Sequence, residues 1–93
     1  MIEVFIDDYG YNLEIGTGFD LTDATTLEVE AKPYLGGTTA TITCTADNTT
    51  DILAPITQGF FDRAGLWEFN AKITFASSVR HGETFRVLVK ENI

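Results

Sequence analysis

The residue types that support nucleophilic catalysis are few in this 93-residue chain. His81 is the only histidine and lies in the turn-like segment VRHGE, so any Ser-His or Cys-His pair would depend on it. Ser77 and Ser78 are close in sequence, but no acidic residue stands at a spacing that would orient the imidazole. The sequence therefore predicts that His81 is a loop residue and that the protein is not an enzyme of this class.

Cys44 is the only cysteine, which excludes an intrachain disulfide. Its setting, TATITCTA, is typical of a strand interior, so we expect a small buried hydrophobic side chain. One cysteine and one histidine on separate elements do not make a zinc site. The chain also has no phosphate-binding glycine loop and no dinucleotide fingerprint. We therefore expect no cofactor and no metal centre built from these residues.

Carboxylates are the remaining groups that could do chemistry. In a β-sandwich the turns at one end cluster, so two pairs of turn acids could share a calcium ion, although their spacing matches no EF-hand loop. A glycosidase pair would need a cleft that a chain of this length hardly provides. Asx turns explain the same residues more simply. The three pairs are Asp7 and Asp8, Asp20 and Asp23, and Asp47 and Asp51.

The charge balance restricts the class of partner. Fourteen acidic and six basic residues give a net charge of −8, which argues against nucleic acid and against anionic membrane surfaces. The first ten residues, MIEVFIDDYG, carry three acids and no basic segment, so we do not expect a signal peptide. The acids predict a solvated acidic surface, with a surface that meets a basic partner as the alternative.

Aromatic residues are the candidates for a contact surface. Trp67 and Phe69 lie on the apolar face of an alternating segment and are expected in the core. Other aromatic residues lie in or beside turns, and if exposed together they would form a patch that binds protein or sugar. The candidate contact residues are Tyr9, Tyr11, Tyr34, Phe60 and Phe61, of which Phe60 and Phe61 could instead cover the open end of a sandwich.

The elements that must position these residues are strands. Alternation of apolar and polar residues predicts about seven short strands and no helix longer than one turn. Such alternation is typical of antiparallel sheets with one wet face, in a β-sandwich or barrel that forms a single domain over residues 1–93. The predicted strands cover residues 2–6, 11–18, 27–32, 39–46, 52–54, 66–75 and 84–91.

One stretch, GFDLTDATTLEVEAKP at residues 18–33, allows two interpretations. Asp20 or Thr22 could cap a helix. The β-branched residues and the cleaner period of two favour a strand that ends at Pro33. We predict that the chain crosses between sheets at residues 20–22, anchored by Leu21, and then enters this strand.

These segments resemble the immunoglobulin-like modules of tailed-phage virion proteins, most closely the N-terminal domain family of upper-baseplate proteins. Members run from a turn through a "dLtgA" segment into a strand that ends in Lys-Pro and a glycine turn. They close with an aG-x-W/Y segment, an alternating strand and a final strand of the F-x-V type. The matching residues, within a span from Tyr9 to Glu91, are Asp20, Leu21, Thr22, Ala24, Lys32, Pro33, Gly36, Gly37, Ala64, Gly65, Trp67, Phe69, Phe85 and Val87.

The resemblance implies an immunoglobulin-like antiparallel β-sandwich and a non-catalytic structural role in a virion assembled in the bacterial host cytoplasm. It implies partners that are other virion proteins in symmetric copies, and no active-site residues. Baseplate members carry further domains, whereas this chain ends at Ile93, so the expectation is a neck, tail or baseplate adaptor or a capsid decoration subunit. A carbohydrate- or receptor-binding module is the alternative.

Overall fold

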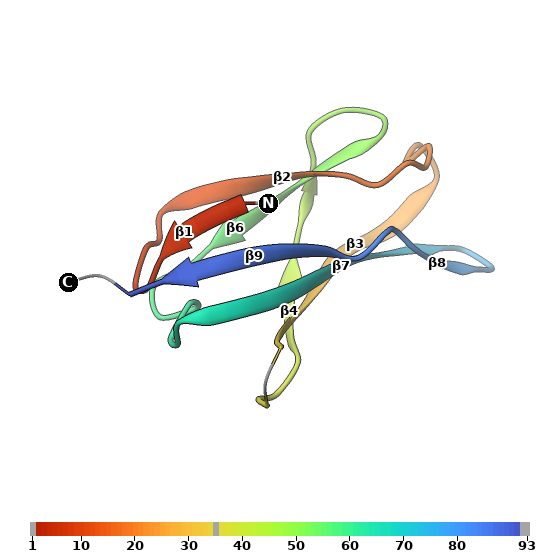
Figure 1. Ribbon diagram of the computed structural model, residues 1–93. Helices are drawn as coiled ribbons and strands as arrows, with labels where there is room; N and C mark the ends of the chain where they lie inside the picture. Colours follow the sequence, from red (N-terminus) through yellow and green to blue (C-terminus); the bar gives the residue numbers. More distant parts are fainter. Residues whose placement is uncertain (1, 35, 92–93) are drawn as a thin grey trace.

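The computed structural model describes residues 2–34 and 36–91, and over this range the fold is all-β, with two sheets that are compatible with a β-sandwich (Figure 1). These residues include no helix that is long and apolar enough to cross a membrane. The strands are β1 (Ile2–Phe5), β2 (Tyr11–Gly16), β3 (Ala24–Pro33), β4 (Ala40–Thr43), β5 (Thr45–Ala46), β6 (Asp51–Ile56), β7 (Gly65–Phe75), β8 (Val79–His81) and β9 (Phe85–Lys90).

The larger sheet has the order β1-β9-β7-β3-β4, with β8 paired to β7, and the smaller sheet has the order β2-β6-β5. All pairs are antiparallel except β1 with β9, which run parallel. The expectation of a wholly antiparallel sandwich was wrong at this pair. The segment after β1 crosses to the other sheet instead of returning as a hairpin, so β1 can lie parallel to the last strand.

The core forms where the inward faces of β3 and β7 meet the smaller sheet. Val29 and Ala31 on β3 and Phe69 and Ile73 on β7 are completely or almost completely buried, as the period of two predicted. The two strands pair over most of their lengths, from Leu27 opposite Ile73 to Pro33 opposite Trp67. Residues 24–33 of the ambiguous stretch therefore form a strand and not a capped helix.

The crossing before β3 has the predicted form. Leu21 is buried, and its N–H donates to the carbonyl of Thr49 at 2.8 Å. Asp20 accepts hydrogen bonds from the backbone N–H and the hydroxyl of Thr22, which closes the turn. The Asp-Leu-Thr-Asp segment thus serves as a structural connection between the two sheets.

The segment TATITCTA departs from the prediction of one strand over residues 39–46. β4 pairs with β3, whereas β5 pairs with β6 in the other sheet, so the chain changes sheets at Cys44. The N–H of Cys44 still donates to the carbonyl of Leu27, and its side chain is buried. The alternating pattern continues through the change, so it could not reveal where the backbone bends.

Three further differences concern short elements. β6 continues through Pro55 to Ile56, beyond its pairing with β5, where a strand tolerates a residue without an N–H. β8 forms a hairpin with β7 in a segment predicted as a turn. The segment FFDRAG at residues 60–65, for which the sequence allows one helical turn, contains none, and the turn before it is closed by the Phe60 N–H, which donates to the Thr57 carbonyl.

Candidate functional site

Three connections meet at one end of the molecule, which we call the aromatic end and define by Tyr9, Tyr34, Phe60 and Phe61. They are the β1–β2 turn, the β3–β4 loop and the connection from β6 to β7, on the left and lower parts of Figure 1. The Asp7 N–H donates to the Phe61 carbonyl at 3.1 Å, which joins the first and the third. An Arg63 guanidinium N–H donates to the Gly36 carbonyl at 3.3 Å, which joins the second and the third. The backbone thus fixes the positions of the aromatic residues.

Tyr9 and Tyr34 are exposed at this end, with 55% and 52% of their surface accessible. Phe5, at the end of β1, is 47% exposed, and the Lys90 ammonium lies 5.8 Å from the centre of its ring. Phe5 was not among the predicted contact residues, although it shares the polar side of an alternating strand with Glu3, which was a usable signal. Tyr9, Tyr34 and Phe5 therefore form the accessible part of the candidate contact surface.

Two of the predicted contact residues face inward. Phe61 is 0% exposed, so its assignment to a contact surface was wrong, and its ring packs edge-on against Trp67 with centroids 5.4 Å apart. Phe60 is half-buried against Phe61 and Trp67, at 5.0 and 5.7 Å. Both aromatic rings close the end of the sandwich, because the core between the sheets would otherwise be open to water.

Tyr11 belongs to the inward face of β2 together with Leu13 and Ile15. It is half-buried, and its hydroxyl lies out of contact with water without a hydrogen-bond partner in the described structure. Burial, and then the charge of Asp8, raise the pKa of Tyr11. Tyr11 is therefore a core residue at the margin of the aromatic end and contributes little to an accessible surface.

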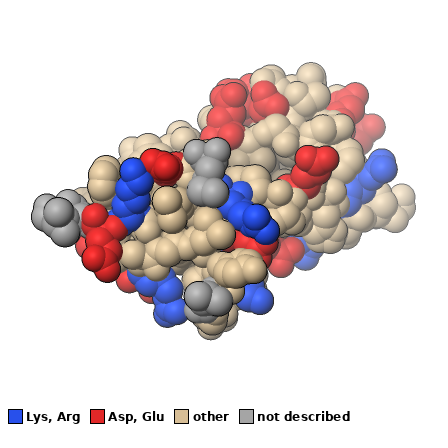
Figure 2. Space-filling view, in the orientation of Figure 1, with Lys and Arg blue, Asp and Glu red and all other residues tan. Residues whose placement is uncertain are grey.

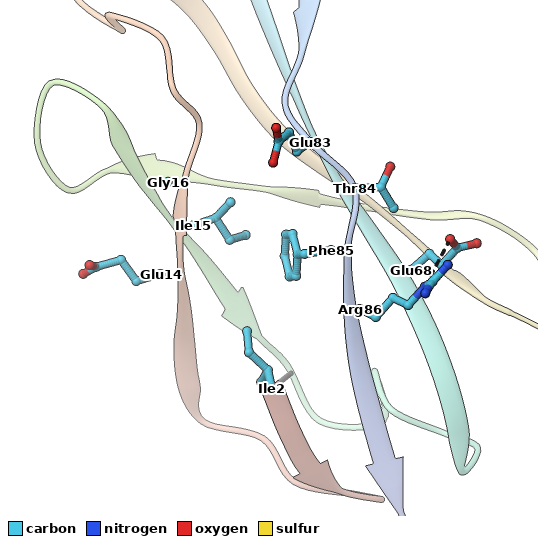
Figure 3. Close-up of a pocket in the computed structure, with 9 residues that line it drawn as sticks. All are labelled: Ile2, Glu14, Ile15, Gly16, Glu68, Glu83, Thr84, Phe85 and Arg86. Atoms are coloured by element: carbon cyan, nitrogen blue, oxygen red, sulfur yellow. Dashed lines mark ion pairs between the residues drawn. The ribbon is translucent and has the colours of Figure 1, made fainter.

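An open groove of about 960 Å³ lies between β2 and the beginning of β9 (Figure 3). Ile15 and Phe85 point toward each other across it, and Ile2 of β1 lies beside them. Glu68 and Arg86 form an ion pair of 3.8 Å on the far side of β9. Among the residues that the structure describes, those that line the groove include no His, Cys or Ser and so supply no pair of a cysteine or serine nucleophile with a histidine base.

The opposite end carries two of the three predicted pairs of turn acids, whereas Asp7 and Asp8 lie in the β1–β2 turn at the aromatic end. We call the opposite end the acidic end, defined by Glu14, Asp20, Asp23, Asp47 and Asp51. Figure 2 shows acidic side chains over the β2–β3 crossing and the β5–β6 hairpin. Carboxylate oxygens of Glu14, Asp47 and Asp51 lie within 4.8 Å of one another. Glu14 was not among the predicted turn acids, because it lies within a strand and reaches the hairpin only across the pairing of β2 with β6.

Hydrogen bonds of the Asn48 side chain form the turn of the β5–β6 hairpin and already engage Asp51. The Asn48 side-chain amide donates to Asp51 at 2.9 Å, and the N–H groups of Thr50 and Asp51 donate to the Asn48 side-chain oxygen. A hydrogen bond to Asp47, and then its negative charge, raise the pKa of Glu14. The three carboxylates could supply three of the six to eight oxygen ligands of a calcium ion, and Asx-type turns account for the rest of the arrangement.

The Cys44 thiol and the His81 imidazole, which a Cys-His pair would need, lie in separate parts of the structure. Burial, and then the charge of Glu28, raise the pKa of the Cys44 thiol to about 11, so it is protonated at neutral pH. His81 lies on β8 with its imidazole 3.9 Å from the Glu30 carboxylate on the wet face of the larger sheet. The prediction that His81 is a loop residue was wrong in its element, because the residue ends a short strand.

Comparison of the chain with protein-family models, with curated proteins and with solved structures gave no match.

Proposed function

We propose that the protein is a non-catalytic structural subunit of a tailed-phage virion, as a neck, tail or baseplate adaptor or a capsid decoration subunit. It would act through contacts with other virion proteins in symmetric copies, after synthesis in the bacterial host cytoplasm. The proposal includes no cofactor, no nucleic acid and no membrane as partners.

The observation that carries the proposal is the placement of the two segments that resemble phage modules. Residues 19–33 form the crossing and β3, residues 65–75 form β7, and these two strands pair at the centre of the larger sheet. Segments that define a family's architecture are expected at such central positions. The support for the proposed role thus comes from the arrangement of the strands and not from a functional site.

The strand order further supports an immunoglobulin-like arrangement. If β2, β6 and β5 correspond to strands B, E and D, the larger sheet has the order A-G-F-C-C′. The parallel pair of β1 with β9 then places the first strand beside the last. The chain would thus be a module with a fixed core and variable loops at its ends, which suits assembly by protein contacts.

Direct analysis of particles tests this proposal. Mass spectrometry of purified virions should detect the chain at a stoichiometry set by the symmetry of one particle component, and cryo-EM should place it there. Particles that contain no copy of the chain would refute the proposed role.

A variant test asks whether the aromatic end makes the contact. Replacing Tyr9 and Tyr34 with serine should reduce incorporation into particles, because the exposed aromatic area lies there. Val79→Ser is the matched control, since Val79 is 50% exposed on β8 and lies away from that end. Equal incorporation of both variants would exclude the aromatic end as the contact.

The alternative function is a carbohydrate- or receptor-binding module, which the exposure of Tyr9 and Tyr34 at one end favours. Aromatic rings beside polar loop residues are a common sugar-binding arrangement, because sugar rings stack on them. Glycan-array binding that the Tyr9→Ser and Tyr34→Ser variants lose, and that Val79→Ser retains, would favour this function over the first.

A further inference from the structure

The outer edge of β4 differs from the other free edges of the two sheets. Residues 36–46, which include β4 and β5, contain no charged side chain. β1 carries Glu3 and β2 carries Glu14, while β5 has only two residues. Sheet edges in monomeric proteins are usually protected by charge, proline, a bulge or shortness, because an unpaired edge can bind another strand. β4 has no charged residue, no proline and no bulge to protect its edge.

The pairing of β4 with β3 determines which backbone groups face outward. The Cys44 N–H donates to the Leu27 carbonyl, and the register continues without a bulge to Ala40 opposite Ala31. In an antiparallel pair, bonded and non-bonded positions alternate. Ile42 therefore bonds to β3, whereas Thr41 and Thr43 direct their N–H and C=O groups toward the free edge.

We infer that this edge pairs with the β4 edge of a second copy of the chain, in an antiparallel two-fold dimer. If Ile42 lies opposite Ile42 of the second copy, Thr41 lies opposite Thr43 of that copy, and both can exchange two hydrogen bonds with it. An antiparallel edge is complementary to itself in this way. The inference rests on the proposed function in one respect. The proposed function assumes that symmetric copies of the chain associate, and the β4 edge would be the surface through which they do so.

The charges near β4 permit this contact despite the net charge of −8. The nearest acids on the same sheet are Glu28 and Glu30 of β3, opposite Thr43 and Thr41. Across the dimer they would be three strand spacings, or about 14 Å, from their counterparts, which exceeds the screening length of about 8 Å at physiological salt. At the β2 edge, by contrast, Glu14 lies on the edge strand itself.

A pairing of only four residues buries little surface, so the dimer should be weak and depend on concentration.

Sedimentation equilibrium from about 10 μM to about 1 mM tests this, because weak pairs dissociate in that range. The wild-type chain should change from monomer to dimer. The double variant Thr41→Lys/Thr43→Lys should raise the dissociation constant by about tenfold or more, since like charges would lie directly opposite across the interface. The matched variant Thr41→Lys/Thr43→Glu should dimerise like the wild type or better, because each lysine then faces a glutamate.

The comparison of the two charged double variants distinguishes the proposed pairing of β4 strands from non-specific association. The double-lysine variant has a net charge of −6, from −8 plus two, so reduced overall repulsion alone would strengthen its association. Hydrogen exchange gives a second measurement at single residues. The Thr41 and Thr43 amides should become protected as the concentration rises, whereas the Ile42 amide should be protected throughout.

The inference is overturned if the wild-type chain stays monomeric over the whole range, if the two double variants behave alike, or if Thr41 and Thr43 gain no protection. A dimer that persists in the double-lysine variant would place the interface elsewhere. A monomeric chain that is nevertheless present in virions would reject the β4 dimer and retain the proposed function. A chain that dimerises as described but is absent from virions would retain the β4 dimer and reject the proposed function.

Discussion

The two ends of the molecule are closed by different interactions. At the aromatic end, the rings of Phe60, Phe61, Trp67 and Phe69 pack with centroids 5.0 to 6.3 Å apart. At the acidic end, Thr17 donates from its hydroxyl and its N–H to the Thr50 carbonyl, at 2.7 and 3.0 Å. One end thus depends on the burial of apolar surface and the other on hydrogen bonds to the backbone.

The two ends therefore differ in how strongly they are held together and in which side chains they expose. Aromatic packing is strong and leaves the adjacent exposed rings of Tyr9 and Tyr34 on a rigid base, which suits a binding surface. The hydrogen bonds of the acidic end are individually weaker, since each replaces a bond to water. We therefore expect substitutions to cost most at the aromatic end and least among the exposed carboxylates.

Phe61→Ala should have the largest effect, because it removes a completely buried ring at the aromatic end. The expected loss is about 3–5 kcal/mol of unfolding free energy, measured by urea denaturation. Phe5→Ala is the control, since nearly half of the Phe5 surface is already exposed. A loss below about 1 kcal/mol for Phe61→Ala would show that the ring is not part of the core.

The sequence predicted most of the strands because their period of two matches a sheet with one buried face. The alternation in the predicted strands at residues 27–32, 66–75 and 84–91 places Val29, Phe69 and Val87 on the inward side, where the structure buries them. The change of sheet at Cys44 and the parallel pair of β1 with β9 were missed. Alternation records which side chains point inward, and it records neither the partner strand nor its direction.

The candidate site was predictable in part for a related reason. Tyr9 and Tyr34 lie in turns, and turns lie on the surface, so their exposure followed from their position. Phe61 also lies outside a strand, but it turns inward because the end of the core needs an apolar cover. Glu14 joins Asp47 and Asp51 only through strand pairing, which a single sequence does not contain.

Thr17→Val should have the second largest effect and tests the acidic end. The Thr17 side chain is buried, donates to Thr50 and accepts from the Phe19 N–H at 3.2 Å, so valine leaves that N–H without its partner. The expected loss is about 1–2 kcal/mol of unfolding free energy by urea denaturation. Thr26→Val, at an exposed position on β3, should change it by less than about 0.5 kcal/mol. Equal losses in the two variants would contradict the hydrogen-bonded closure.

Asp20 should show a smaller, pH-dependent effect. Hydrogen bonds from the Thr22 hydroxyl and N–H lower the pKa of Asp20. A carboxylate with a lowered folded-state pKa stabilises the fold above its ordinary pKa, and this contribution disappears as the pH falls through the folded-state value. The stability difference between the wild type and Asp20→Asn, followed by thermal melting, should therefore shrink as the solution is acidified. A difference that is constant with pH would mean that the charge has no part in the turn.

Glu14 should show the smallest effect, and with the opposite sign. Its pKa is raised by the hydrogen bond to Asp47 and by the negative charges around it, so the folded state favours the protonated form. The stability cost of the charge appears as the pH rises through that raised pKa, and it is absent below the ordinary glutamate value. At neutral pH, Glu14→Gln should therefore increase the melting temperature slightly.

Glu3→Gln is the matched control for Glu14→Gln, because both variants remove one negative charge from an exposed glutamate. Lys90, whose ammonium lies 2.7 Å from the Glu3 carboxylate, lowers the pKa of Glu3, so glutamine should decrease the melting temperature there. If both variants raise the melting temperature, relief of the overall net charge of −8 explains the effect. Opposite signs would instead show that the local carboxylates around Glu14, and not the total charge, cause its destabilising effect.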